Sequence, residues 1–232
     1  MILSPEVASA LEFKNSLEER FELAAGLDGR AYYSAVYSLP RRSPLLWINL
    51  NPGGTPENHK VLSDGDLAKG KHEFFEGHGK TSVATGKFLR GLFVGQEARV
   101  RSIQGTNVVW QRSEQGSDLD ITQCARLTAP FVRETIKYVK PELLIFGGID
   151  SCDKFIAAQN ATILSAEEPV MGPWGKNKAR IAQKLHITIP EIGEVHVVAV
   201  SHPSRGVRAD AFNLAALATK GIALPAPLQM LV

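Results

Sequence analysis

"LLWINLNPGG", residues 45 to 54, is an apolar run that stops abruptly at an asparagine and a glycine-rich turn. The large and branched side chains from Leu45 to Leu50 are typical of a buried strand. The turn from Asn51 to Gly54 then carries one carboxamide beside a proline and two glycines. Asn-Pro-Gly-Gly is an ordinary turn sequence, but a polar group at the end of a buried strand is also well placed to contact a ligand.

Alternating strand and helix patterns follow this segment along the chain. Further runs rich in branched residues predict strands at residues 107–111, 142–146 and 195–200. Apolar residues at helical spacing predict helices at residues 85–98 and 122–139. This succession predicts an α/β fold, a three-layer sandwich with a central, mainly parallel four-stranded sheet flanked by helices. Sheets of this kind bind ligands at the carboxyl ends of their strands.

The composition is that of a globular protein with one core. The chain has 232 residues, of which 44% are hydrophobic and 22% are charged. We expect a single domain over residues 1–232, with residues 1–44 as a helical N-terminal preface that Pro5 starts and Gly26 ends. No apolar stretch approaches the roughly 20 residues of a membrane span, and no signal pattern begins the chain. We therefore expect a cytoplasmic protein without a membrane partner, and we take it as a monomer.

Charge and cysteine content narrow the partners and cofactors only slightly. A net charge of +2 permits a polyanionic partner without indicating one, because such binding depends on where basic residues cluster. Cys124 and Cys152 cannot build a four-thiolate metal site, although they leave a single disulfide open. The histidines show no recognised zinc spacing. We expect no metal and no other cofactor.

Polar sequences also stand at the ends of two other predicted strands. The second strand begins at Asn107 and leaves through Gln111-Arg112-Ser113, and the fourth runs into Ser201-His202-Pro203-Ser204. Alone, an asparagine opening a strand is more often a local backbone partner, and a single histidine is more often packed or solvated. Their appearance together with Asn51 on one predicted edge of the sheet favours a common site.

These sequences resemble the motifs of the uracil-DNA glycosylase superfamily. "INLNPGG" looks like its first motif, Gly-X-Asn-Pro-Gly, and "SHPSRG" looks like its second motif, which carries His-Pro-Ser. Between them, "TNVVWQRS" resembles the middle strand of the iron-sulfur branch, and "TAPFVRETIKYVKPELLIFGG" resembles the helix and strand that follow it. The resemblance runs from about Leu45 to Ala218.

The resemblance implies a monofunctional DNA glycosylase. Such an enzyme hydrolyses the N-glycosidic bond of uracil or a related altered base, flipped out of single-stranded or duplex DNA, and leaves an abasic site. Asn51 would orient the attacking water, and His202 would stabilise the negative charge on the departing base. Asn107 would read the edge of the base, and Leu50 and Phe75 would line its pocket.

The same resemblance places DNA beside the first and second motifs. Gly53 and Gly54 would expose backbone N–H groups and let a sugar-phosphate approach closely. Ser204 would bind a phosphate next to the lesion. The gap left by the extruded nucleotide would be filled by Arg205, Val207 or Arg208.

The sequence departs from the family pattern at three places. Asn49 stands where the first motif has its glycine, so a side chain occupies a point of close backbone approach. Gln111 stands where the iron-sulfur branch has a cysteine, so no cluster is expected. The aromatic residue that stacks on the base falls in an expanded segment, where Phe74 and Phe75 are the candidates.

Two other functions stay open at this point. The same site could act on a different damaged or modified base, including one in foreign DNA, because the rewritten segment from Gly54 to Lys80 would shape the pocket. Alternatively, the chain is a DNA-binding module that has lost its activity. The joint presence of Asn51, Asn107 and His202 weighs against this last function.

Overall fold

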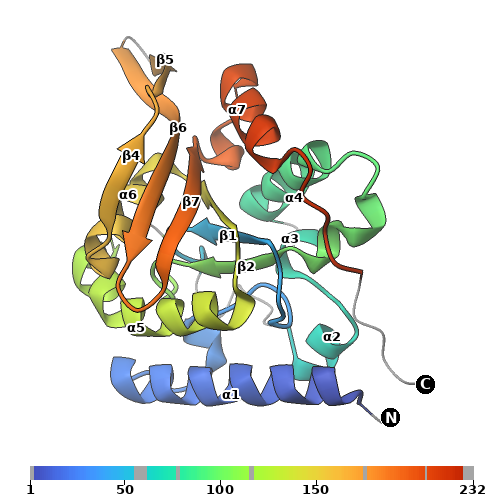
Figure 1. Ribbon diagram of the computed structural model, residues 1–232. Helices are drawn as coiled ribbons and strands as arrows, with labels where there is room; N and C mark the ends of the chain where they lie inside the picture. Colours follow the sequence, from blue (N-terminus) through green and yellow to red (C-terminus); the bar gives the residue numbers. More distant parts are fainter. Residues whose placement is uncertain are drawn as a thin grey trace.

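The protein is an α/β structure in which helices flank a mixed β-sheet (Figure 1). This computed structural model describes residues 3–54, 62–76, 79–114, 118–174, 177–206 and 208–226, without the side chains of Glu97 and Trp174. Among these residues the sheet has seven strands. The α/β class and the flanking helices predicted from the sequence are confirmed.

The elements follow one another along the chain as helices, strands and short 3-10 turns. The helices are α1 (Pro5–Ala25), α2 (Asp64–Ala68), α3 (Glu73–Glu76), α4 (Lys80–Leu92), α5 (Ile121–Val139), α6 (Ile149–Gln159) and α7 (Ala209–Thr219). The strands are β1 (Leu45–Asn49), β2 (Gln104–Asn107), β3 (Leu143–Gly147), β4 (Thr162–Ala166), β5 (Val170–Trp174), β6 (Asn177–Ile189) and β7 (Gly193–Val200). The 3-10 turns span Arg30–Tyr32, Glu97–Ser102 and Pro203–Arg205.

The sheet has a parallel half and an antiparallel half. Strands β2, β1, β3 and β7 are neighbours in that order and run parallel. β6 pairs antiparallel with β7, and β4 and β5 both pair antiparallel with β6. The expected four-stranded, mainly parallel sheet is therefore corrected to a mixed sheet of seven described strands. β4 is absent from the prediction because it is exposed along its whole length and shows no apolar alternation.

The second strand lies earlier in the chain than the predicted range 107–111. β2 ends at Asn107, the residue at which the prediction begins it. Val108 and Val109 still donate their N–H groups to carbonyls at the end of β1, each at 2.8 Å, but the chain bends there. Asn107 therefore lies at the carboxyl end of β2, paired with the last residue of β1.

The ends of α1 and α5 follow the sequence signals. α1 starts at Pro5 and ends before Gly26, whose φ of 63° is the left-handed conformation that favours glycine. α5 ends before Lys140, where a proline follows. α4 begins and ends earlier than the predicted range 85–98. It ends earlier because the chain turns out of the helix after Leu92, and Gly95 adopts a φ of 84°.

Apolar side chains fill both interfaces between the helices and the sheet. On one face, α1, α5 and α6 contribute Phe21, Phe131 and Phe155 to the core. On the other face, α3 and α4 contribute Phe74 and Leu89, and α7 adds small residues. The predicted N-terminal helix is thus packed into the same core as the sheet. No helix within the described ranges is long and apolar enough to cross a membrane.

Candidate active site

A cleft lies at the carboxyl edge of the parallel strands. Its volume is about 450 Å³, which is within the range of small-molecule pockets. The ends of β1, β3 and β7, the start of α6 and part of β6 line it. Three of the predicted site residues, Leu50, His202 and Arg205, are among the lining residues.

His202 lines this cleft as a neutral side chain with one unbonded ring nitrogen. Its Nδ1 accepts a hydrogen bond from the backbone N–H of Ser204 at 3.2 Å, which only an unprotonated nitrogen can do. Burial, and then the nearby Arg205 guanidinium, lower the pKa of His202, so the ring is neutral at pH 7. The ring proton therefore sits on Nε2, which makes no hydrogen bond with any described residue.

The start of α6 gives the cleft backbone hydrogen-bond donors that have no partner within the helix. α6 follows Gly147 and Gly148 without a side-chain cap, so its first backbone N–H groups have no partner within the helix. The Oγ of Ser201, at the end of β7, is buried without a hydrogen-bond partner among the described residues. Arg180 on β6 adds a guanidinium, which pairs with Asp153. Because a helix N-terminus favours negative charge, these donors suit an anion, although the exposed Asp150 carboxylate in the first turn of α6 opposes it.

Asn51 follows Leu50 in the chain but is not among the residues that line the cleft. Its Nδ2 donates to the Ser113 hydroxyl at 3.0 Å and to the Pro52 carbonyl at 3.2 Å. Its Oδ1 accepts no hydrogen bond from any described residue, and the side chain is partly exposed. The carboxamide therefore has an acceptor left over for a water molecule.

Asn107 is sealed inside the protein and does not reach the cleft. Its Oδ1 accepts a hydrogen bond from the Tyr37 hydroxyl, its Nδ2 donates to the Ser34 carbonyl at 3.2 Å, and its exposure is 0%. Asn49, which stands at the first-motif glycine position, donates to the same Tyr37 hydroxyl at 3.4 Å. The structure therefore does not bring Asn107 together with His202.

The two candidate stacking aromatics also lie away from the cleft lining. Phe74 is buried and packs on Tyr37, with 4.1 Å between the ring centroids. Phe75 is partly buried, and the guanidinium carbons of Arg90 and Arg101 lie 4.9 Å and 5.7 Å from its ring centroid. The sequence did not contain the signal for this placement, because the contacts join segments far apart in the chain.

The turn after β1 is held by the segment that follows β2. Gly53 forms a parallel bridge with Ser113, and the Arg112 guanidinium donates to the Gly53 carbonyl at 3.3 Å. Gly54 has a φ of 87°, a conformation that residues with a side chain rarely adopt. Gly53 is exposed, which leaves this turn accessible to a sugar-phosphate.

The turn after β7 carries the other predicted DNA contacts. The Ser204 hydroxyl lies 2.7 Å from Nδ1 of His202, so it already has a partner in the protein. Arg205 and Arg208 are exposed, and Arg208 donates to the Pro173 carbonyl on β5. Val207, the third candidate for filling the gap in the DNA, lies outside the described residues.

No model of a known protein family matches this chain, and no curated protein matches it either. The resemblance to the uracil-DNA glycosylase superfamily therefore rests on the three motifs themselves.

Several residues of this region were not predicted as site residues from the sequence. They are Ser113, Ser201 and the glycines that precede α6. Ser113 and Ser201 stand within the quoted motifs, and Gly147-Gly148 ends a predicted strand, so their sequence neighbourhood was the available signal. For Arg180 the sequence favours a solvated loop over a patch that contacts phosphates, whereas the structure places it on β6 in the lining of the cleft.

The described residues offer no evident place for a metal ion. Among them, no group of three or more His, Cys, Asp or Glu side chains is arranged to hold one. Cys124 and Cys152 are both free thiols, and burial raises the pKa of Cys152 to about 12. A thiol with such a pKa is protonated at neutral pH and is a weak nucleophile and a weak metal ligand.

Proposed function

We propose that this protein is a monofunctional DNA glycosylase that releases uracil or a related altered base from DNA. The observation that carries the proposal is the neutral His202, which lines the cleft at the strand ends and keeps its Nε2–H unbonded. A neutral imidazole can donate this hydrogen bond to a base oxygen throughout the reaction. As expected from the sequence, we place the enzyme in the cytoplasm as a monomer, with single-stranded or duplex DNA as its partner.

The chemistry of base release requires such a donor. Breaking the bond between a base and its sugar leaves positive charge on the sugar and negative charge on the base. A donor aimed at the base oxygen stabilises this charge as it develops, and the loss of one such donor costs about 3 to 4 kcal/mol in other enzymes. His202 supplies the donor from a partly buried position, where water screens the interaction less than at the surface.

The donors at the start of α6 suit the phosphate that accompanies a flipped nucleotide. The first N–H groups of the helix, which have no partner within it, and the Ser201 hydroxyl can donate to phosphate oxygens. Ser204 already contacts His202, so we assign the phosphate mainly to these donors. A cleft of about 450 Å³ has room for a base together with its sugar.

Asn51 is proposed to hold the attacking water. Its unbonded Oδ1 can accept a hydrogen bond from that water, but a carboxamide cannot remove a proton at neutral pH. Its contribution is therefore orientation. We expect base release to be slower than in an enzyme that places a carboxylate at this position.

The released base is assigned only by class. Asn107 remains the predicted reader of the uracil edge, but it reaches a base only if Tyr37 and Ser34 give up its carboxamide. A different altered base, recognised by other groups of the cleft, keeps the same chemistry at His202. Parallel assays on strands that carry uracil, hypoxanthine or xanthine separate these two possibilities.

Single-turnover release of uracil from a single-stranded oligonucleotide tests the proposal. His202→Ala is expected to slow release about 100- to 1,000-fold while DNA binding changes little. His196→Ala is the matched control, because His196 stacks on His186 and does not line the cleft. Wild-type rates in His202→Ala contradict the proposed site. DNA binding without release of any of the three bases by the wild type identifies an inactive binding module.

A further inference from the structure

We propose that Ser113 is a positioning residue, which acts with the Pro52 carbonyl to hold Nδ2 of the Asn51 carboxamide so that Oδ1 is presented to water. This inference rests on the proposed function of Asn51. It concerns a residue of the middle motif that lies beyond β2 and outside the lining of the cleft. The argument depends on hydrogen bonds around the turn that follows β1.

The orientation of the Asn51 carboxamide is determined by two partners of different character. The Pro52 carbonyl, 3.2 Å from Nδ2, can only accept a hydrogen bond, so the nitrogen must be on its side. The Ser113 hydroxyl, 3.0 Å from the same nitrogen, accepts the second hydrogen bond. Both Nδ2 protons are then engaged, and Oδ1 is left without a partner among the described residues.

Ser113 is itself held in place by the backbone. It is buried, with an exposure of 8%, and it forms a parallel bridge with Gly53 in the turn that contains Asn51. The hydroxyl therefore approaches the carboxamide from a strand-like segment and not from a free loop. A partner whose backbone is bridged to the same turn limits the rotation of the carboxamide.

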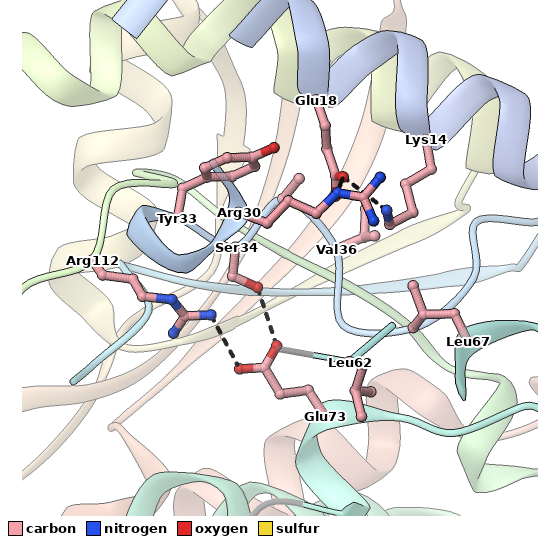
Figure 2. A pocket seen from close by; sticks show the side chains of 11 residues that line it. Lys14, Glu18, Arg30, Tyr33, Ser34, Val36, Leu62, Leu67, Glu73 and Arg112 are labelled. Carbon is pink, nitrogen blue, oxygen red and sulfur yellow. Dashed lines mark hydrogen bonds and ion pairs between the residues drawn. The ribbon is translucent and has the colours of Figure 1, made fainter. Parts of the chain in front are cut away.

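The buried Arg112 side chain, next to Ser113 in the chain, stabilises the same turn. The Arg112 guanidinium donates to the Gly53 carbonyl at 3.3 Å and lies 4.0 Å from a carboxylate oxygen of Glu73. The Ser34 hydroxyl donates to the other carboxylate oxygen of Glu73 at 3.1 Å. Figure 2 shows Arg112 and Ser34 both directed at Glu73. The turn is thus fixed through its carbonyl as well as through the Asn51 side chain.

Loss of the Ser113 hydroxyl is expected to reduce the fraction of correctly oriented Asn51. Only the Pro52 carbonyl then restrains the carboxamide, so Nδ2 faces the water in a larger fraction of molecules. An N–H group binds the oxygen of a water molecule and does not accept its proton. The net worth of one hydrogen bond corresponds to roughly a three- to tenfold change in rate. DNA affinity should change little, since Ser113 does not line the cleft.

The test measures single-turnover uracil release and DNA binding for Ser113→Ala, Ser113→Thr, Asn51→Ala and the Ser113→Ala/Asn51→Ala double variant. We expect Ser113→Ala to lose about three- to tenfold in rate and Ser113→Thr, which keeps the hydroxyl, to recover most of it. In the double variant, removal of Ser113 should have no further effect beyond Asn51→Ala. Ser165→Ala, an exposed serine on β4, is the matched control and should keep the wild-type rate.

The outcomes separate this inference from the proposed function. Additive losses in the double variant, or no rescue by threonine, overturn the positioning role while base release itself stands. If the wild type releases no base, the proposed function fails. The melting temperatures of the same variants then test the contact between Asn51 and Ser113. If the decreases in melting temperature of the two single variants add up in the double variant, that contact is overturned as well.

Discussion

The two asparagines assigned to the site differ in which carboxamide atoms are already hydrogen-bonded. Asn51 is partly exposed and keeps an unbonded Oδ1, whereas Asn107 is fully buried with both ends bonded. A buried polar group that is already satisfied gains little from a ligand and costs free energy when its partner leaves. Asn51 can therefore bind a ligand through its Oδ1 without losing a hydrogen bond, whereas Asn107 can bind one only after a local rearrangement.

Replacement of Asn51 by aspartate tests its role with the smallest change in shape. The Ser113 hydroxyl can donate to a carboxylate as readily as it accepts from an amide, although the Pro52 carbonyl loses its donor. A carboxylate both orients water and favours the sugar cation, so Asn51→Asp should retain or raise the single-turnover rate. Asn51→Ala should slow release and leave DNA affinity nearly unchanged. Wild-type rates in the alanine variant contradict the assignment of the attacking water to Asn51.

Because Asn107 is buried, we expect its replacement by aspartate to have a different effect from that of Asn51→Asp. Asn107→Asp loses the donor to the Ser34 carbonyl and buries a carboxyl group, which should lower the free energy of unfolding by about 1 to 3 kcal/mol. Uracil release should fall as well if Asn107 reads the base. Urea unfolding and single-turnover release measure the two effects. Asn213→Asp, at an exposed position on α7, is the matched control. Unchanged release in a folded Asn107→Asp protein excludes Asn107 as the reader.

At the scale of elements, the parallel strands were the predictable part of the fold. β1, β3 and β7 are almost continuous apolar runs, as expected of strands covered on both faces. β6 did carry a signal, because Leu185, Ile187 and Ile189 alternate with less buried residues. The end of β2 could not be predicted from the sequence, because Val108 and Val109, which follow the strand, are as buried as the residues within it.

The candidate site, too, could be predicted from the sequence only in part. Leu50, His202 and Arg205 meet in the cleft because local motifs at strand ends fix their positions. The burial of Asn107 depends on Tyr37, 70 residues away in the chain, whose ring packs closely over Gly105. Contacts between such distant segments follow from tertiary packing and leave no periodic pattern in the sequence.

The segment before α3 contains a buried histidine that makes stability depend on pH. The Nε2 of His72 lies 2.9 Å from the Ile103 carbonyl, and its Nδ1 accepts from the Phe74 N–H at 3.1 Å. Burial lowers the pKa of His72 from 6.5 to about 4. Because the folded pKa lies below the unfolded value, this contribution to stability is present above pH 6.5 and is lost as the pH falls toward 4.

Urea unfolding between pH 7 and pH 4 tests this link. For the wild type, His72 alone should account for a loss of up to about 3 kcal/mol across that interval. His72→Gln should be less stable at pH 7 and should show a smaller loss on acidification, since the acidic residues shared by both proteins cancel in the comparison. His196→Ala is the control for an exposed histidine. Equal pH dependence in the wild type and His72→Gln is the result that argues against a buried neutral His72.

At the scale of the whole molecule, charged groups tie the N-terminal helix to the rest of the chain. Lys14 of α1 is buried and pairs with Glu18 at 2.7 Å and with Asp64 of α2 at 3.1 Å. Arg30 also contacts both carboxylates, and Figure 2 shows Lys14 and Arg30 directed at Glu18. Partial burial alone would raise the pKa of Asp64, but the hydrogen bonds from Arg30 and Lys14 outweigh it and lower the pKa to about 2. α1 is therefore held by ionic contacts as well as by its apolar face.

If the protein releases a base as proposed, the described lining of the cleft predicts what remains of the DNA. Enzymes that also cut the strand use an amine to form a Schiff base with the sugar, and among the described residues that line the cleft there is no lysine. Arg180 and Arg205 cannot replace it, because a guanidinium stays protonated and is not a nucleophile.

We therefore expect an intact strand with an abasic site, which breaks only after treatment with alkali. Borohydride should trap no covalent complex, and release should continue in the presence of a chelator, since Asn51 and His202 supply the proposed chemistry. A strand break without alkali, together with a borohydride-trapped complex, contradicts the monofunctional assignment. Loss of release in chelator that a divalent ion restores contradicts the metal-independent mechanism.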